Sequence, residues 1–421
     1  MASYRLVITA LRPTNHSLVL SSRLERPENT YVVNDGTAAA LAIKGWIIVS
    51  SQCIPRLVLE FTNYCVEAQL IYRHDVEAVN GAKFPLGSVH YLGYDIDSVS
   101  AESFVGLKIV YPGYNVGHEE EPLIRVERQR IIKPLQGKHG WLYLDNDTNK
   151  SVDQFLGTHS LSDKHIHKWR SYLSEVRKIH EDLQCDWRFL VAPAKEYVAS
   201  FLYPYEKGES TTLEQLKSIL DELCPVETIK CIPYLASQWN VAYSPVDTHW
   251  TDIGAFFVAC LIADSFGHPV NILTEILACA RFTQVVSSGD LGSKMDPKVL
   301  CHIANVDSST LPIKKVYDNG VHNHGRIWIY DGLNNDSGST LIVFGDSFGT
   351  NLSPWLACLY SRLVYCHTSA GIDISILRKE GPCHVLLQTN SRFIGVVPSC
   401  SYSILEVASV KGCDQQNIIY F

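Results

Sequence analysis

The chain has 421 residues, of which 46% are apolar and 19% are Asp, Glu, Lys or Arg. At about 150 residues per domain this length suggests two or three domains, and the composition excludes a small disulfide-stapled fold and wholesale disorder. The net charge of −8 comes from 44 acidic and 36 basic residues, and no run of Lys and Arg could follow a phosphate backbone. We therefore expect no nucleic acid partner.

The sequence shows no targeting or membrane signal. Its first twenty residues lack the basic start and unbroken apolar stretch of a secretory signal, and no window reaches the roughly 18 apolar residues of a spanning helix. Thirteen cysteines include no CxxC pair and mostly have apolar neighbours, which is typical of reduced core thiols. These features predict a soluble cytoplasmic protein without a transmembrane segment.

The first domain is predicted over residues 1–125. Short β-like runs, such as residues 4–11 and 42–51, alternate there with turn residues at a spacing of roughly ten. This pattern predicts an antiparallel β-sandwich. The acidic residues 119–121 and Pro122 then interrupt the strand pattern before a basic segment.

The second domain is predicted over residues 130–421, where helical and strand patterns alternate. Residues 161–184 place apolar side chains at spacings of three and four on one helix face. The apolar run 341–345 predicts a buried strand, and Ser353 with Pro354 is typical of a helix start. The alternation predicts a mostly parallel sheet with helices on both faces.

A serine follows that buried strand in the sequence Gly345-Asp346-Ser347. At the carboxyl end of a parallel strand, beside a helix start, its hydroxyl would lie where ligands bind in open α/β folds. Its own N–H could then donate to an oxyanion. The alternative interpretation is a simple turn, because Gly, Asp and Ser are common turn residues.

Asp247 and His249 stand just before a predicted helix. Residues i and i+2 of an extended segment project to the same side, and a carboxylate beside an imidazole stabilises the imidazolium. Ser347, His249 and Asp247 therefore form a candidate catalytic triad. The alternative is a helix-entry cluster in which Asp247 or Thr251 caps the helix.

Five short motifs follow one another along the second region. They are GKHGWLYLDND (137–147), APAKEYV (192–198), DTHW (247–250), SGDLGSKM (288–295) and GDSF (345–348). In kind and order they resemble the SGNH-hydrolase-like domain of the alginate O-acetyltransferase family over about residues 130–395. Ordinary SGNH esterases place the serine block first, so the order separates this chain from them.

The resemblance implies a flavodoxin-like three-layer α/β/α fold and acyl transfer through a serine ester. It implies Ser347 as the nucleophile, His249 as the base and Asp247 as its orienting partner. We expect neither a metal nor a bound cofactor.

Three further residues are predicted to contact substrate. Lys195 and Arg392 lie near predicted strand ends, where a cation can bind an anionic sugar or a transition-state oxygen, and Asp290 lies in the SGDLGSKM loop. The alternatives are solvated cations at the sheet rim and an aspartate that caps a turn. The family tends to have Glu before the arginine, whereas this chain has Ser391, which leaves acceptor recognition open.

Three segments of the first region also form a pattern: AIKGWIIVSS (42–51), YRHDV (72–76) and YLGYDID (91–97). They resemble a small β-sandwich module found beside enzymes of bacterial glycan assembly, whose exposed aromatic residues could stack on sugar rings. The alternative is that Trp46 packs in the core of the sandwich.

Together these features predict a serine-dependent O-acetyltransferase that modifies a bacterial polysaccharide or glycan precursor. A soluble donor such as acetyl-CoA suits a chain without a membrane segment, although a separate membrane protein could supply the acyl group. Two alternatives stay open: a glycan acetyl esterase with the same triad, and a non-catalytic carbohydrate-binding protein. The intact set of Ser347, His249 and Asp247 favours an enzyme.

Overall fold

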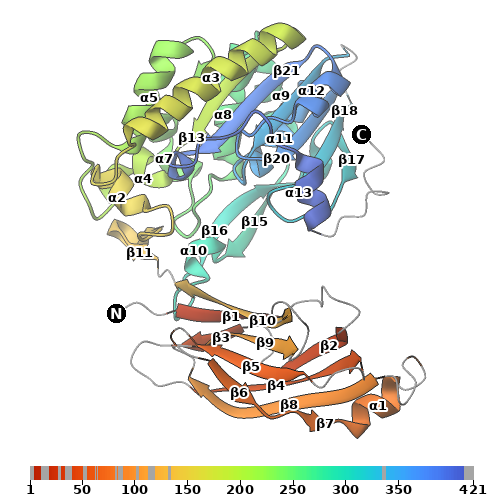
Figure 1. Ribbon diagram of the computed structural model, residues 1–421. Helices are drawn as coiled ribbons and strands as arrows, with labels where there is room; N and C mark the ends of the chain where they lie inside the picture. Colours follow the sequence, from red (N-terminus) through yellow and green to blue (C-terminus); the bar gives the residue numbers. More distant parts are fainter. Residues whose placement is uncertain are drawn as a thin grey trace. The chain divides into compact units, whose positions relative to one another are not determined.

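The computed structural model describes residues 4–10, 19–26, 30–33, 40–50, 55–61, 63, 65–80, 83, 89–100, 104–111, 119–130, 134–333 and 338–411. The chain divides into two compact units, residues 1–132 and 133–421 (Figure 1). Helices and several sheets are both present, so the predicted mixed α/β class is confirmed.

Unit 1 contains two antiparallel sheets. The first has the order β3 (Thr30–Val33), β1 (Tyr4–Ala10), β10 (Glu119–Arg130), β9 (Phe104–Tyr111), β5 (Arg56–Phe61) and β6 (Cys65–Ala68). The second has the order β2 (Val19–Arg26), β4 (Ala40–Ser50), β8 (Val89–Ser100) and β7 (Ile71–Tyr72). A short helix, α1 (His74–Asn80), follows β7.

Strand β10 corrects one prediction. Its acidic start does not interrupt the strands, because Glu119 pairs with Tyr111 and Pro122 pairs with Lys108 of β9. The register shifts between Pro122 and Ile124, and a bulge is a position where a proline, which has no N–H, is tolerated. β10 therefore continues beyond residue 125.

The motif residues of unit 1 contact one another around Arg73. Its guanidinium donates to Asp75 at 2.6 and 2.7 Å and to Glu25 at 3.1 and 3.2 Å. A Cβ at Gly93 would lie 2.5 Å from Cγ of Arg73, so the glycine makes room for this side chain. The YRHDV and YLGYDID segments thus fit together as a structural cluster.

Trp46 is partly buried. It packs against a small core cluster made of Ile48, Val76, Val89 and Tyr91. This contact favours the interpretation that Trp46 packs in the core over the one in which its ring is presented to a sugar.

The main sheet of unit 2 has seven strands. Their order is β14 (Thr228–Ile229), β13 (Asp186–Ala192), β21 (His384–Asn390), β19 (Thr340–Gly345), β20 (Arg362–His367), β18 (Ile327–Gly332) and β17 (Ile313–Asp318). The first five are parallel, and β18 and β17 continue the sheet with antiparallel pairings.

Counted along the chain, the five parallel strands stand in the order 2-1-5-3-4, not in the flavodoxin order 2-1-3-4-5. If the strands are numbered from β19 instead, with β13 and β14 following β21, the sheet read from the β20 side has the order 2-1-3-4-5. The chain thus enters this arrangement at β13, which places the segment with Asp247 and His249 before the strand that leads to Ser347.

Helices cover both faces of this sheet (Figure 1). Along β19, Leu341 and Val343 join one core cluster and Ile342 and Phe344 join the other, because successive side chains of a strand alternate between faces. The first cluster includes residues of α8 (Asp252–Ser265), α9 (Val270–Cys279) and α11 (Gly349–Ala357). The second includes residues of α3 (Asp163–Leu183), α5 (Thr212–Leu223), α12 (Ile374–Glu380) and α13 (Ile404–Val410).

Shorter elements complete unit 2. They are β11 (Leu135–Gln136), β12 (Leu142–Tyr143), α2 (Ser151–Leu156), α4 (Lys195–Val198), α6 (Ile232–Ser237), α7 (Trp239–Ala242), β15 (Phe282–Ser287), α10 (Gly289–Gly292) and β16 (Cys301–Val306). β15 and β16 form an antiparallel pair of their own.

Two helix starts test the predictions in this unit. α3 begins after Ser162, whose hydroxyl accepts from the N–H of His165, in agreement with the predicted helix. α11 begins earlier than predicted, so Ser353 and Pro354 lie inside it. The turn at Ser347 leads directly into this helix, since the N–H of Gly349 already donates to the carbonyl of Asp346.

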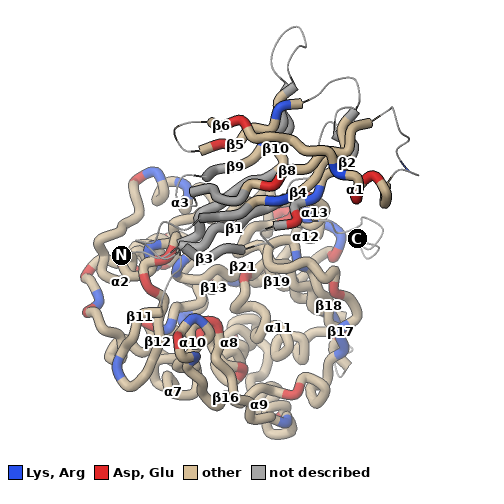
Figure 2. The backbone as a smooth tube through the Cα atoms, turned by 90° about the horizontal axis from the view of Figure 1, so that it is seen from below, with Lys and Arg blue, Asp and Glu red and all other residues tan. Residues whose placement is uncertain are grey.

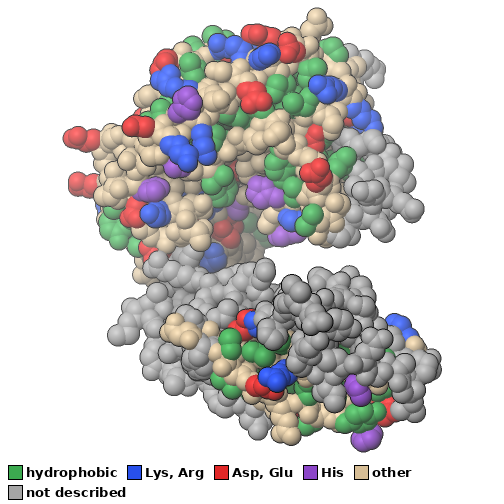
Figure 3. Space-filling model, viewed as in Figure 1, with side chains coloured by type: hydrophobic (Ala, Val, Ile, Leu, Met, Phe, Trp, Pro, Cys, Tyr) green, Lys and Arg blue, Asp and Glu red, His purple; other side chains and the backbone are tan. Residues whose placement is uncertain are grey.

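The described surface of unit 2 mixes residue types. Lys and Arg are interspersed with Asp and Glu along the chain (Figure 2), and on the face drawn in Figure 3 hydrophobic side chains lie in small groups among polar ones. Within the described residues, no helix combines the length and the apolar character needed to cross a bilayer.

Candidate active site

The loop after β19 carries Ser347. A Cβ at Gly345 would lie 2.8 Å from Oε1 of Gln388, which explains the glycine at the end of the strand. Oε1 of Gln388 accepts from the N–H of Asp346 at 2.8 Å, and its Nε2 donates to Oδ1 of the same aspartate at 2.7 Å. Oδ1 of Asp346 also accepts from the N–H of Phe348 at 3.0 Å. The backbone on both sides of Ser347 is therefore held from β21.

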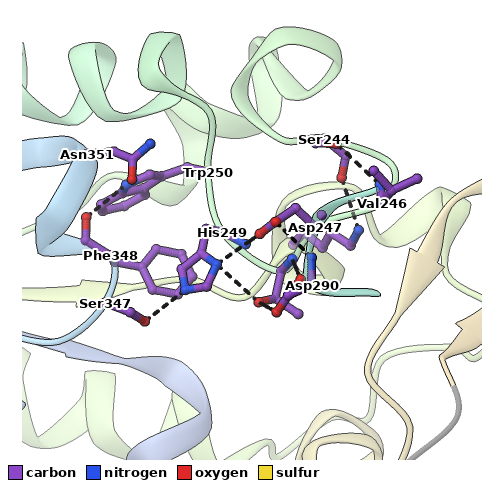
Figure 4. A network of polar contacts seen from close by, with 12 residues as sticks. Ser244, Val246, Asp247, His249, Trp250, Asp290, Ser347, Phe348 and Asn351 are labelled. Atoms are coloured by element: carbon purple, nitrogen blue, oxygen red, sulfur yellow. Dashed lines mark hydrogen bonds and ion pairs between the residues drawn. The ribbon is translucent and has the colours of Figure 1, made fainter. Parts of the chain in front are cut away.

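The three predicted triad residues lie together (Figure 4). Oγ of Ser347 is 2.8 Å from Nε2 of His249, and Nδ1 of His249 is 2.9 Å from Oδ1 of Asp247. Ser347 is half-buried, and the side chains of His249 and Asp247 are 30% and 29% exposed. In this geometry the imidazole can take a proton from the serine hydroxyl while the carboxylate holds its other nitrogen.

Asp247 is held in its ionised form. Burial alone would raise the pKa of this carboxyl, but hydrogen bonds from the ring and backbone of His249 outweigh that effect and lower the pKa to about 2. The N–H of Asp290 donates to the second oxygen at 3.0 Å. A negative charge is thus fixed beside Nδ1, where it would stabilise an imidazolium.

Asp290 is joined to the triad segment. Its Oδ1 accepts from the N–H of Thr248 at 2.7 Å, and its Oδ2 accepts from the Thr248 hydroxyl at 2.5 Å. These contacts hold residue 248, between the two triad members. The geometry favours a positioning role for Asp290 over the predicted contact with substrate.

Lys195 is buried, with 2% of its surface exposed. Its ammonium donates to the carbonyls of Ser244 and Pro245, both at 3.1 Å, and lies 5.3 and 5.1 Å from the ring centres of Trp141 and Tyr143. Burial lowers the pKa of Lys195 to about 7, although nearby carboxylates act in the opposite direction. This lysine supports the segment that leads to Asp247, which again favours positioning over substrate contact.

Arg392 follows β21, the strand between β13 and β19. Its Nε donates to Oδ1 of Asn390 at 3.0 Å, and it is half-buried. Burial raises the pKa of Asp346, and Arg392 is close enough to oppose that rise. The contact of Arg392 with substrate stays a prediction. The preceding Ser391 accepts from the N–H of Ala194 at 2.9 Å and so links the ends of β21 and β13.

Aromatic residues connect the two triad segments, and the sequence did not single them out. The ring centres of His249 and Phe348 are 5.0 Å apart, and Nε1 of Trp250 donates to the Phe348 carbonyl at 3.0 Å. The signal was present, because these are the last residues of the GDSF and DTHW motifs. Gln388 had no such signal, since one polar residue in an apolar strand does not reveal its partner.

The helix-entry alternative holds for Thr251 and not for Asp247. Thr251 caps α8, its hydroxyl accepting from the N–H of Gly254 at 3.0 Å. The carboxylate of Asp247 instead binds the ring and the backbone N–H of His249. Asp247, His249 and Asp290 also lie close enough to be weighed as metal ligands, but their hydrogen bonds to one another and to backbone N–H groups account for the cluster.

A cavity of about 160 Å³ opens beside the imidazole. Its wall includes His249 and Asp247, the starts of α8 and α11, and the β15–β16 pair. Polar side chains contribute much of this wall: Ser244, Thr251, Asp252, Ser287, Asn305 and Asn351. A hydroxylated molecule in this cavity would lie against the candidate base.

No family model and no curated protein matches the chain. Among solved structures, a DHHW family protein from Eubacterium siraeum has 14% identity and a TM-score of 0.42, over 66% of this chain and 98% of that one. The O-acetyltransferase domain of Pseudomonas putida AlgJ has 14% identity and a TM-score of 0.37, over 66% and 99%. Bacillus cereus PatB1 with a sulfonyl adduct has 14% identity and a TM-score of 0.45, over 65% and 99%.

Proposed function

We propose that this protein is a serine-dependent O-acetyltransferase that modifies a bacterial polysaccharide or glycan precursor. The observation that carries the proposal is the hydrogen-bonded series from Oγ of Ser347 through His249 to the ionised Asp247. The same observation opposes a non-catalytic carbohydrate-binding protein, because such a protein has no need of an aligned nucleophile, base and carboxylate.

In the first half of the reaction, Nε2 of His249 takes the proton of the Ser347 hydroxyl as Oγ attacks the acetyl carbonyl carbon. The tetrahedral oxyanion would be stabilised by backbone N–H groups. Within the described residues the N–H of Ser347 donates to no protein acceptor, so it is available for this role. Collapse returns the proton to the leaving group and leaves an acetyl ester on Ser347.

In the second half, an acceptor hydroxyl gives its proton to His249 and attacks the ester carbonyl. The bond to Oγ breaks, and the proton passes to Ser347. The acceptor must therefore reach Nε2 of His249. We place it in the cavity whose wall includes this histidine, with the amides of Asn305 and Asn351 as partners for sugar hydroxyls.

The second candidate is a glycan acetyl esterase. It is favoured by the 30% exposure of the His249 side chain, because a water molecule can reach the base as well as a sugar hydroxyl can. The two functions share the acetyl-Ser intermediate and differ in which hydroxyl attacks it.

The proposal includes a donor and a location. A soluble acetyl thioester such as acetyl-CoA would serve as donor, used as a substrate and not held as a cofactor. The cytoplasm is the compartment in which that donor and reduced cysteines occur together.

Intact mass after brief incubation with a chromogenic acetyl ester tests the proposal. We expect one added acetyl group, absent in Ser347→Ala and present in the matched variant Ser218→Ala, which changes an exposed serine of α5. Unmodified protein together with no turnover would contradict it. Adding short acetyl-free oligosaccharides then separates the candidates, since a transferase yields acetylated sugar and an esterase yields acetate alone.

A further inference from the structure

Two cysteines face each other at the amino ends of neighbouring core strands. Cys185 immediately precedes β13 and Cys383 immediately precedes β21. The two strands are parallel with Asp186 opposite His384, and the N–H of Asp186 donates to the carbonyl of Cys383 at 3.1 Å. The cysteines are therefore opposite each other by register, although 198 residues separate them in the sequence.

Their sulfur atoms are 3.6 Å apart. Neighbouring strands lie about 4.8 Å apart, which is inside the Cα separation of about 4.4–6.8 Å that disulfides span. A side-chain rotation that brings the sulfurs to about 2.0 Å would join them without moving the strands. Among the described cysteines this is the pair whose sulfur atoms lie in contact.

The surroundings favour reaction with a small oxidant. Both residues are buried, at 8% and 7% exposure, so bulky thiol reagents have little access. The hydrogen bond from the Cys383 thiol lowers the pKa of Cys185 to about 7, against the opposing effect of burial. A thiolate at Cys185 beside a second thiol is the arrangement in which an oxidised sulfur is captured by its neighbour.

We propose that Cys185 and Cys383 form a reversible disulfide site that responds to a peroxide-class oxidant. The Cys185 thiolate attacks one peroxide oxygen, the O–O bond breaks, and a sulfenic acid and one water are formed. The sulfur of Cys383 then attacks that sulfenic sulfur and expels a second water. Two thiols and one hydrogen peroxide thus give one disulfide and two waters, and a dithiol reductant reverses the change.

The bond would join β13 and β21 at the amino ends of the parallel strands. Ser347 lies at the opposite ends of the strands, because it follows the carboxyl end of β19. It would close a long loop, and cross-links of long loops restrict the unfolded chain most. The expected result is a higher unfolding temperature with unchanged ester turnover.

The test uses the reduced full-length protein and stoichiometric hydrogen peroxide, followed by alkylation and a non-reducing peptide map. We expect a loss of two hydrogen atoms in the intact mass and one cross-linked peptide pair that contains Cys185 and Cys383. Dithiothreitol should reverse both changes, and the oxidised form should unfold at the higher temperature.

Two variants complete the test. Cys383→Ser should give no cross-link and should leave a sulfenic acid at Cys185, measured as one added oxygen atom in the intact mass. Cys279→Ser, which changes an exposed cysteine, should keep the cross-link. The proposal is overturned if wild-type Cys185 and Cys383 stay reduced while exposed Cys65 and Cys279 are oxidised, or if the cross-link forms between other cysteines.

Discussion

The motif residues of unit 1 form ion pairs around an arginine, whereas those of unit 2 form a hydrogen-bonded serine and histidine. In unit 1, the guanidinium of Arg73 is occupied by Asp75 and Glu25, and Gly93 makes room for it. In unit 2, the hydroxyl of Ser347 and the ring of His249 are paired with each other and still reach the surface. Short motifs signalled both places, but in the second they align a hydroxyl with an imidazole and a carboxylate.

The two regions also hold a cation differently. Arg73 lies between two carboxylates, whereas Lys195 is buried and donates to two backbone carbonyls. The arginine therefore stabilises its own surroundings through ion pairs. The lysine is kept at an electrostatic cost, and what it supports is the segment with Asp247. A costly buried charge beside reactive residues is typical of a functional site.

The largest expected effect is the loss of ester turnover when a triad residue of unit 2 is replaced. Ser347→Ala and His249→Ala should each lower turnover of a chromogenic acetyl ester by at least about 10³-fold, because each removes a member of one concerted unit. The double variant should lose little more than either single one. Asp247→Asn should be damaging as well, since an amide favours the wrong imidazole tautomer.

Steady-state kinetics of the purified variants measure these losses, with Ser218→Ala and the exposed His302→Ala as matched controls. Losses that add in the double variant would mean that Ser347 and His249 act independently, and the proposed mechanism would then fail.

The next effect concerns the buried cation. The pKa of Lys195 is about 7 in the folded protein against an ordinary value of 10.5, so the unfolded chain binds more protons between these pH values. Stability should therefore rise with pH across this window, by up to about 4 kcal/mol from pH 7 to pH 10. Lys195→Met removes that contribution.

Chemical unfolding at several pH values measures the difference in unfolding free energy between wild type and Lys195→Met. Lys164→Met, which changes an exposed lysine of α3, serves as the control and should give a flat difference. A flat difference for Lys195→Met too would show that burial does not lower the pKa of this lysine.

The sequence predicted the triad because its members carry recognisable local chemistry, Asp247 and His249 two residues apart and Ser347 after an apolar strand. The contact between His249 and Ser347, which are 98 residues apart, was predicted from the order of the motifs and not from residue spacing. Gln388 was missed because its role depends on strand order, which no local pattern shows. β10 was missed because a strand that tolerates Pro122 at a bulge resembles a linker when read alone. The sandwich arrangement of unit 1 stays a prediction.

A third prediction concerns the cavity beside His249. Asn305 is exposed on β16 and lines the cavity, so Asn305→Trp should fill it. We expect the KM for a saccharide acceptor to rise by roughly tenfold or more, while formation of the acetyl-Ser adduct changes by less than about twofold.

His302→Trp is the matched control, because His302 lies on the other side of the same strand and does not line the cavity. Separate measurements of adduct formation and of transfer to the saccharide distinguish the two steps. If both tryptophan variants transfer acetyl groups equally well, the acceptor binds elsewhere.

The smallest effect tests the structural interpretation of the unit 1 motifs. Arg73→Met removes a guanidinium whose side chain is 14% exposed and leaves Glu25, 27% exposed, without that partner. Because an ion pair at a partly buried site contributes modestly, unit 1 should lose about 1–2 kcal/mol of unfolding free energy. Arg73→Lys should recover only part of the loss, since an ammonium cannot bind two carboxylates in the bidentate manner of a guanidinium.

Ester turnover should stay at the wild-type value in both variants, because every triad residue belongs to unit 2. Denaturant unfolding and ester kinetics on the same preparations measure the two quantities. A folded Arg73→Met protein with reduced ester turnover would show that unit 1 takes part in the reaction, and the contrast between a structural and a reactive motif cluster would no longer hold.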